Sequence, residues 1–380
     1  MRDLPVYRHK AEILKALKEN QVLIVESPTG SGKTTQLPLI LKEAGYDELG
    51  IIGITQPRRI ATLSICDFIK RQLEIEADNH YCAYTMRFDD TSDATTRIKI
   101  MTDGILLQEM KANPYLSNYS VIMVDEAHER SLNIDFILGL LKQITEVRPE
   151  LKIIISSATI NTQAFSAFFN DAPIISIQAG AFPVEIKYTT TYQRKRFMFF
   201  EGDYLNIAYL IQNSIENNEG DILVFLPGEY DILQVADYIK PLASKTVVYL
   251  LYGRLSKEEQ EKVFTPTPDN KTKIVISTNI AETSITIDGI KVVIDSGLAK
   301  TNFYNQKNFT SSLESGPISK SSAIQRSGRA GRTQPGICYR LYSQDDFDSK
   351  KDFTVPEILR SDLAEVVLRM SELGIYDYEA

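Results

Sequence analysis

The sequence predicts an α/β protein made of two successive halves, each a parallel sheet flanked by helices. Two observations support this prediction: short apolar runs alternate with helical stretches, and the alternation pauses near residue 180 and then resumes. Apolar runs that are separated by helices are typical of buried parallel strands. The length of 380 residues also fits two domains with some chain left over, at roughly 150 residues per domain.

The first half contains short apolar runs that we predict to be buried strands. The earliest run ends in a glycine-rich turn, after which a helical pattern starts at Lys33. A longer helical pattern over residues 129–147 separates the last two runs. The predicted strands span residues 21–27, 50–55, 97–101, 120–124 and 151–156.

The connection between the halves lies near residue 180, where Gly180 and Pro183 interrupt the pattern and residues 189–203 show no clear periodicity. We therefore predict one domain over residues 1–179 and a second over 180–355. The remaining residues, 356–380, include an amphipathic helical pattern over 356–373. In the second domain, we predict strands at 221–226, 245–250, 273–277 and 291–295, helices at 229–240 and 256–264, and a β-hairpin over 298–313.

Composition excludes several classes of protein. The formal net charge of −8 argues against a chain that is basic all over and coats nucleic acid, but it allows a local basic channel. The three cysteines and three histidines show neither a disulfide framework nor metal-ligand spacing. No apolar run reaches the roughly 18 residues of a membrane span, and the N-terminus has no apolar signal region. These observations favour a cytoplasmic protein.

A glycine-rich segment at the first strand-to-helix turn is typical of a phosphate-binding loop. Backbone N–H groups of such a loop surround phosphate oxygens, and the dipole of the following helix adds to the attraction. Lys33 would reach the terminal phosphates and the Thr34 hydroxyl would bind Mg²⁺. Ser27 replaces the usual opening glycine. The residues expected to bind the nucleotide are Thr29, Gly30, Ser31, Gly32, Lys33, Thr34 and Thr35.

An acidic pair follows the apolar run 121–124. Carboxylates at the carboxyl end of a buried parallel strand lie where open α/β sheets bind ligands. Asp125 would hold Mg²⁺ directly or through water, and Glu126 would accept a proton from the attacking water. Thr34, Asp125 and Glu126 are therefore the expected metal-binding residues. His128 is either a structural histidine or a residue that couples hydrolysis to movement.

Arginines and glycines alternate over residues 325–332, which we place at a helix start. Arg329 and Arg332 are three residues apart and share a helical face. Arginines presented to a phosphate site from another domain stabilise the charge that develops in phosphoryl transfer. Gln325 could orient the attacking water. A solvated basic helix end is the alternative, but the phosphate loop and acidic pair favour a catalytic role for Glu126, Gln325, Arg329 and Arg332.

Together these motifs resemble the signature set of the DEAH-box helicases of superfamily 2. Further segments match that family in the same order along the chain. Within the family, residues 25–30 look most like those of bacterial HrpA-type RNA helicases. The additional matching segments are 55–59, 102–104, 157–159, 223–228 and 277–289.

The resemblance implies two RecA-like P-loop NTPase domains that sandwich ATP and lay RNA across both. It also implies that residues 356–380 are the start of a winged-helix domain, so that the chain would be a motor-core fragment or a reduced member. By the same resemblance, Asp125, Phe264 and Asp288 contact the nucleotide, and His128, Ser157 and Thr159 couple hydrolysis to unwinding. The implied RNA-binding residues are Arg58, Arg59, Arg87, Thr102, Asp103, Gly228, Thr278 and Asn279.

Some of these assignments keep a second interpretation. Phe264 would stack on the nucleotide base, but its helical spacing also fits a core position. Relatives place an arginine opposite this base, where the present sequence has Phe68, with Arg71 one turn further along. Either Phe68 or Arg71 stacks on the base, or the base is held weakly. Aromatic residues of the hairpin, such as Phe309, could contact bases or be half-buried in a sheet.

The motifs and the resemblance together imply an ATP-dependent RNA helicase motor that moves along or unwinds RNA in the 3′-to-5′ direction. We expect it to act as a monomer on single-stranded RNA or on a duplex with a single-stranded tail. Because stacking does not read hydrogen-bond patterns, other NTPs are also expected to serve. The alternatives are a nucleotide-switched RNA-binding clamp that hydrolyses ATP without unwinding, and a DNA helicase. The sequence identifies neither the RNA target nor an activating protein.

Overall fold

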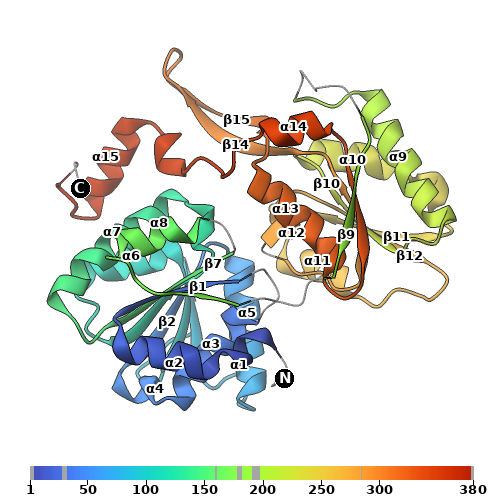
Figure 1. Cartoon of the computed structure of the whole chain (residues 1–380). Coiled ribbons are helices and arrows are strands. Elements are labelled where there is room, and N and C mark those ends of the chain that lie inside the picture. Colours follow the sequence, from blue (N-terminus) through green and yellow to red (C-terminus); the bar gives the residue numbers. More distant parts are fainter. Residues whose placement is uncertain are drawn as a thin grey trace. The chain divides into compact units, whose positions relative to one another are not determined.

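The structure of the chain is a computed structural model that describes residues 4–27, 32–158, 161–177, 182–190, 197–283 and 285–377 (Figure 1). The chain divides into two compact units: unit 1 comprises Met1–Ala179 with Val355–Ala380, and unit 2 comprises Gly180–Thr354. Each unit contains a largely parallel sheet with flanking helices, so the predicted α/β fold is confirmed. Apolar residues of the described C-terminal segment, such as Val366 and Met370, pack on the core of unit 1.

The sheet of unit 1 has eight strands in the order β4-β3-β5-β2-β6-β7-β1-β8. Among these described strands only the β3–β4 pair is antiparallel. Because the central strands are parallel, their carboxyl ends lie along one edge of the sheet. The strands are β1 (Val22–Glu26), β2 (Ile51–Gln56), β3 (Cys82–Met86), β4 (Asp89–Asp90), β5 (Ile98–Thr102), β6 (Tyr119–Val124), β7 (Lys152–Ser157) and β8 (Ile174–Ser176).

Helices cover both faces of this sheet (Figure 1). Apolar residues of α6, α7 and α8 pack on one face, and those of α2, α3 and α5 pack on the other. Strand β6 is buried along its whole length, as expected for a parallel strand covered on both sides. The helices are α1 (Pro5–Arg8), α2 (Lys10–Glu19), α3 (Lys33–Glu43), α4 (Tyr46–Leu49), α5 (Arg59–Gln72), α6 (Asp103–Ala112), α7 (Leu132–Val147), α8 (Thr162–Phe168) and α15 (Leu363–Glu372), with short 3-10 helices η1 (Ala127–Glu129) and η5 (Glu357–Leu359).

All predicted strands of the first half are present within a residue or two of their expected bounds, whereas β3, β4 and β8 were not predicted. Strand β8 has only three residues, and β3 carries polar residues among its apolar ones, so neither forms a clear apolar run. The predicted helix over 129–147 begins later, at Leu132. Glu126 and Arg130 have φ values of 57° and 47°, which interrupt a helix, and the Ser131 hydroxyl then caps α7 by accepting from the Ile134 N–H at 3.2 Å.

Unit 2 has a six-stranded parallel sheet in the order β11-β12-β10-β13-β16-β9, and a separate antiparallel hairpin, β14–β15. Its strands are β9 (Val184–Tyr188), β10 (Asp221–Phe225), β11 (Thr246–Leu251), β12 (Thr272–Ser277), β13 (Ile290–Asp295), β14 (Leu298–Asn305), β15 (Thr310–Pro317) and β16 (Gly336–Arg340). Its helices are α9 (Glu201–Glu216), α10 (Glu229–Tyr238), α11 (Lys257–Glu261), α12 (Ile280–Thr283), α13 (Lys320–Gly328) and α14 (Gln344–Ser349), with 3-10 helices η2 (Lys240–Leu242), η3 (Lys262–Phe264) and η4 (Arg329–Gly331).

The predicted strands, helices and hairpin of unit 2 are present, and the hairpin continues to Pro317. Strands β9 and β16 and helices α9, α12 and α14 were missed. The helix start predicted at residues 325–332 is wrong, because α13 begins earlier, behind the Ser319 cap, and these residues form its end and the following η4. Strand β9 is a half-exposed edge strand that starts directly after Pro183, and the prediction treated this part of the chain as a connector. Helix α9 begins inside the stretch 189–203, where the Asp203 carboxylate caps it by accepting from the Phe200 N–H at 2.8 Å.

The continuous helix predicted over 356–373 is wrong in its first part, which is the short helix η5 followed by a break before α15. The reason is that Glu357 is tied to the start of α7. Its N–H donates to the Arg130 carbonyl at 3.0 Å, and its carboxylate accepts from the Leu132 N–H at 2.7 Å. Helix α15 begins at Leu363, and Asp362 caps it, because the Asp362 carboxylate accepts from the Ala364 N–H at 3.1 Å.

The described cysteines, Cys66, Cys82 and Cys338, are buried and form no disulfide. None of the described helices is long and apolar enough to cross a membrane.

Gly53 in the middle of β2 leads to a test of the packing in unit 1. A Cβ at this position would lie 2.7 Å from Cε1 of the buried Tyr119. We expect Gly53→Ala to lower the free energy of unfolding by about 1–3 kcal/mol, because the ring has no room to move. Gly139→Ala on α7 is the matched control: a Cβ there meets nothing within 4 Å, and this change should be neutral or slightly stabilising. Equal effects of the two changes in denaturant unfolding would contradict the packing argument.

Candidate nucleotide site

The phosphate loop and the acidic pair meet at the carboxyl edge of the unit 1 sheet. Lys33 and Thr34 open helix α3 after strand β1, and Asp125 follows strand β6. Parallel strands bring these loops together, so that the Thr34 hydroxyl donates to Oδ2 of Asp125 at 2.8 Å. The predicted loop residues Thr29, Gly30 and Ser31 lie outside the described residues.

Gly32 and Lys33, at the start of α3, have a backbone conformation and a side-chain contact that suit the end of a phosphate-binding loop. Gly32 has a φ of +83° and directly precedes the helix, a backbone conformation that residues with a Cβ rarely adopt. The Lys33 side chain is buried, and its ammonium donates to the Ser27 carbonyl oxygen at 3.4 Å, on the other side of the loop. The positive charge of Lys33 is therefore held beside the loop that would surround the phosphates.

Asp125 offers an oxygen atom that suits a hard cation. Its Oδ2 accepts from Thr34 and, at 2.5 Å, from the Gln56 side-chain amide, whereas its buried Oδ1 has no hydrogen-bond partner among the described residues. A carboxylate oxygen beside a threonine hydroxyl is the donor set that Mg²⁺ prefers. The site thus fits Mg²⁺. Gln56 was not predicted; its only signal was its place at the end of β2.

Glu126, His128 and Glu129 form an acidic cluster beside Asp125, with potential ligand atoms within 4.8 Å of one another. Burial and the neighbouring charge of Asp125 raise the pKa of Glu126 to about 8, while Lys33 acts in the opposite direction. The φ of 57° at Glu126 is an uncommon backbone conformation for a residue other than glycine, and such conformations gather at functional sites.

His128 connects the acidic pair to strand β7. Its Nδ1 accepts from the backbone N–H of Ala158 at 3.1 Å, and its Nε2 lies 3.3 Å from Oε2 of Glu126. Burial, together with the charges of Lys33 and Arg58, lowers the pKa of His128 to about 3, so the ring is neutral and carries its proton on Nε2. This proton faces Glu126. Of the predicted coupling residues, Ser157 lies next to Ala158, and Thr159 lies outside the described residues.

The predicted RNA-binding residues of unit 1 have different surroundings. Arg58 pairs with Glu129, with Nη1 and Oε1 2.7 Å apart, which sequence reasoning did not foresee. Arg59 and Arg87 are exposed; Arg59 donates to the Arg87 carbonyl oxygen at 3.0 Å, and the Arg87 guanidinium lies 4.9 Å from the ring centre of Phe88. Arg59 and Arg87 are therefore in contact with each other, whereas Arg58 is paired with an acidic residue.

The other two predicted RNA-binding residues of unit 1 lie at the junction of β5 and α6. Thr102 ends the strand and precedes the helix. Asp103 opens the helix, but its carboxylate is buried and its Oδ1 has no hydrogen-bond partner among the described residues. Burial and the nearby Glu129 raise the pKa of Asp103 to about 7.

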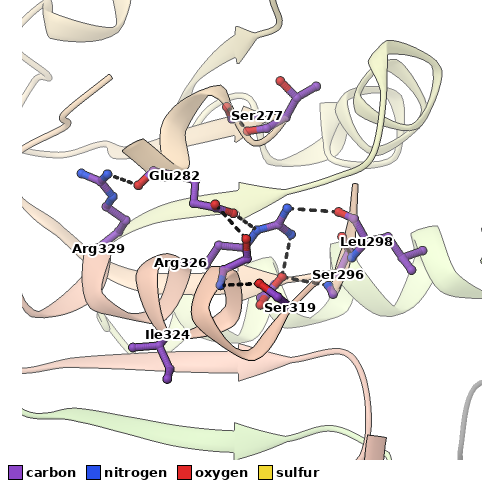
Figure 2. Close-up of polar contacts among 12 residues, drawn as sticks. Ser277, Glu282, Ser296, Leu298, Ser319, Ile324, Arg326 and Arg329 are labelled. Carbon is purple, nitrogen blue, oxygen red and sulfur yellow. Dashed lines mark hydrogen bonds and ion pairs between the residues drawn. The ribbon is translucent and has the colours of Figure 1, made fainter. Parts of the chain in front are cut away.

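The predicted nucleotide-site residues of unit 2 include two arginines that contact other segments of the unit. Arg329 is buried at the end of α13, and its Nη2 donates to the Glu282 carbonyl oxygen (Figure 2). Nη1 of Arg332 lies 3.6 Å from Oδ1 of the exposed Asp288. Gln325 is half-buried on α13, and its Nε2 has no hydrogen-bond partner among the described residues.

The remaining predicted residues lie at strand and helix ends of unit 2. Thr278 and Asn279 follow β12, and Gly228 precedes α10, where a Cβ would meet the Lys300 side chain at 2.9 Å. Phe264 is 54% exposed, which disfavours its alternative interpretation as a core residue. In unit 1, the Arg71 guanidinium lies 6.0 Å from the ring centre of Phe68, so both candidate stacking partners occupy one patch of α5.

Two family matches cover most of the chain. Residues 7–167 match the family described as DEAD/DEAH box helicase, and residues 205–334 match the family described as helicase conserved C-terminal domain.

Similar proteins include the ATP-dependent RNA helicase HrpA of Borreliella burgdorferi, which is 52% identical over 378 residues, covering 99% of this chain and 45% of that protein. HrpA of Escherichia coli (strain K12) is 46% identical over 380 residues, covering 100% of this chain and 29% of that protein. The crystal structure of the E. coli DExH-box NTPase HrpB has a TM-score of 0.87 at 32% identity, covering 99% of this chain and 46% of that one. The chain thus spans less than half the length of these relatives.

Because the Asp103 carboxyl is buried, we expect its replacement by a neutral residue to increase the free energy of unfolding, and to do so more at high pH than at low pH. Because its pKa of about 7 in the folded chain lies above the ordinary value of 3.8, ionisation of Asp103 costs folding free energy as the pH rises from about 4 through 7. Asp103→Asn removes this cost. It should raise the free energy of unfolding, relative to the wild type, by on the order of 2 kcal/mol more at pH 8 than at pH 4.

Denaturant unfolding at the two pH values measures this difference. Asp345→Asn, at an exposed carboxylate in the first turn of α14, is the control and should show no such pH dependence. A gain for Asp103→Asn that is equal at pH 4 and pH 8 would show that the Asp103 carboxylate is not destabilised by burial.

Proposed function

The chain belongs to the DEAD/DEAH box helicase family, and on that premise we propose that it is an ATP-dependent RNA helicase motor that moves along or unwinds RNA in the 3′-to-5′ direction. The observation that carries the proposal is the contact between Thr34 and Asp125, which joins the phosphate loop to the acidic pair. The names of the HrpA relatives support RNA as the nucleic acid.

In this proposal ATP binds to the loop that ends at Lys33, and Thr35 and the expected loop residues Thr29, Gly30, Ser31 and Gly32 contribute to phosphate binding. Lys33 supplies a fixed positive charge, and Thr34 and Asp125 hold Mg²⁺, which when bound neutralises phosphate charge. Glu126 accepts the proton of the attacking water, a role that needs its ionised form. Lys33 favours that form, because it opposes the effect of burial on the Glu126 pKa.

Residues of unit 2 complete the reaction in the proposed cycle. Gln325 orients the water, and Arg329 and Arg332 stabilise the charge that develops on the transferred phosphoryl group. Hydrolysis leaves ADP, release of the terminal phosphate removes the contacts that it made, and the hold on RNA through Arg59, Arg87, Thr278 and Asn279 changes as a result. Phosphate contacts of this kind position the RNA without reading its sequence.

Glu126→Gln tests the proposed base. The amide cannot accept the proton, so we expect ATP turnover at saturating ATP to fall by about 100-fold or more, while ATP binding is kept. Phosphate release measures turnover, and binding of a fluorescent ATP analogue measures affinity. Glu150→Gln, at a carboxylate that is 65% exposed, is the control and should behave as the wild type. Turnover at the wild-type rate in Glu126→Gln would refute the assignment.

Stimulation of ATP hydrolysis by RNA tests the proposed substrate. Single-stranded RNA should raise the ATPase rate more than DNA of the same sequence. The RNA concentration for half-maximal stimulation should rise with salt, because phosphate contacts release counterions. Arg59→Ala should reduce the slope of this salt dependence by roughly 1, and Lys240→Ala, at an exposed lysine on η2, should leave it unchanged. An ATPase rate that does not change when RNA is added would refute the proposal. Stimulation by RNA without strand displacement would support the alternative of an RNA-binding clamp that does not unwind.

A further inference from the structure

Arg326 is a fully buried arginine on helix α13 of unit 2 (Figure 2). Its guanidinium donates to three separate segments of the chain. Nε reaches Oε1 of Glu282 in α12 at 2.8 Å, and Nη1 reaches Oδ1 of Asp295 at the end of β13 at 2.9 Å. Nη2 reaches the carbonyl oxygen of Leu298 at the start of β14 at 3.2 Å. One side chain therefore ties α13 to the ends of its neighbours.

Both carboxylates that receive Arg326 are held by further donors. Oε2 of Glu282 accepts from the Ser322 hydroxyl at 3.0 Å. Asp295 accepts from the backbone N–H of Gly297 at 2.8 Å through Oδ1, and from the Tyr342 hydroxyl at 3.2 Å through Oδ2. Neither carboxylate can move without breaking other bonds, so the network has one well-defined arrangement.

Glu282 links this network to Arg329. Its side chain pairs with Arg326, and its backbone carbonyl accepts from Nη2 of Arg329 (Figure 2). The place of the Arg329 side chain thus depends on the place of α12, and α12 is held to α13 by the charge pair. Arg326 and Arg329 are three residues apart in the sequence, and both contact Glu282, one through its carboxylate and the other through its backbone carbonyl.

We propose that Arg326 is a positioning residue for Arg329 and acts through Glu282. The inference rests on the proposed function, in which Arg329 stabilises the developing charge. Buried ion pairs add little stability compared with apolar packing of the same volume, so stability alone does not account for this network. What the guanidinium provides is a rigid fork of donors with fixed directions, which a lysine cannot copy. In this role Arg326 does not touch the nucleotide.

A double-mutant cycle on the whole chain tests the proposal. Arg326→Gln should lower kcat for RNA-stimulated ATP hydrolysis by about tenfold or more, with KM for ATP changed by less than about threefold, because the lost interaction acts only in the transition state. In the Arg329→Ala background the same substitution should lower kcat by less than about twofold, since its target is gone. Effects that multiply in the double variant, or a wild-type kcat for Arg326→Gln, would overturn the proposal.

Glu282→Gln covers the case in which Arg326→Gln does not fold. It keeps the side-chain shape and an oxygen acceptor but removes the charge, and it should show the same loss of kcat and the same dependence on Arg329. Far-ultraviolet circular dichroism and thermal unfolding establish which variants are folded. A folded Glu282→Gln with wild-type kcat would also overturn the proposal.

Arg340→Gln is the matched control for loss of a buried arginine. Arg340 is also buried in unit 2, but its side chain contacts the Tyr188 hydroxyl at 2.9 Å and lies over the Phe347 ring at 4.3 Å from its centre. Its replacement should lower thermal stability without a tenfold loss of kcat, and its effect should be the same with or without Arg329. An Arg340→Gln loss of kcat that also vanishes in Arg329→Ala would show a general effect of destabilisation and would overturn the inference.

The wild type separates this inference from the proposed function. If RNA does not stimulate the wild-type ATPase, the proposed function fails, and the same cycle is then measured on unstimulated hydrolysis. If RNA does stimulate it and the two substitutions act independently, only the role of Arg326 fails.

Discussion

The alignment of parallel strands at one edge of a sheet is the constraint on which unit 1 depends. Strand β7 separates β1 from β6, yet the loops after β1 and β6 meet because all three strands run in the same direction. The bond from Thr34 to Asp125 is the result. Thr34 and Asp125 are far apart in the sequence, so it is the parallel sheet that brings the candidate nucleotide site together.

The candidate nucleotide site of unit 1 contains more carboxylates than a buried site usually does. Burial raises the pKa of Glu126 and of Asp103, and the nearby charges of Asp125 and Glu129 raise both further. Lys33 and the Arg58–Glu129 pair offset part of this charge. Such an excess of acceptors is costly in the free chain and suits a site that receives a cation and a phosphate-bearing ligand.

The sequence is a good guide where chemistry depends on local pattern. A glycine-rich turn before Lys33 and an acidic pair after a buried strand predict the two halves of the site, because each has a fixed place at a strand end. It is a poor guide where partners come from distant segments. Gln56 and Glu129 contact Asp125 and Arg58, but neither partner follows from spacing, and Asp103 gave no sign that its carboxylate is buried. Edge strands such as β9 were missed because half-exposed strands carry a weak apolar pattern.

The carboxylates at the carboxyl edges of the two parallel sheets have different surroundings. In unit 1, Oδ1 of Asp125 has no hydrogen-bond partner among the described residues, so the edge keeps an acceptor for a ligand. In unit 2, Asp295 also ends a central strand, but the Arg326 guanidinium fills the space beside it and neutralises it together with Glu282. A carboxylate already paired with a buried arginine cannot serve a metal ion. The carboxylate at this edge of unit 2 is therefore occupied by an arginine, whereas the one in unit 1 keeps an oxygen that can accept a ligand.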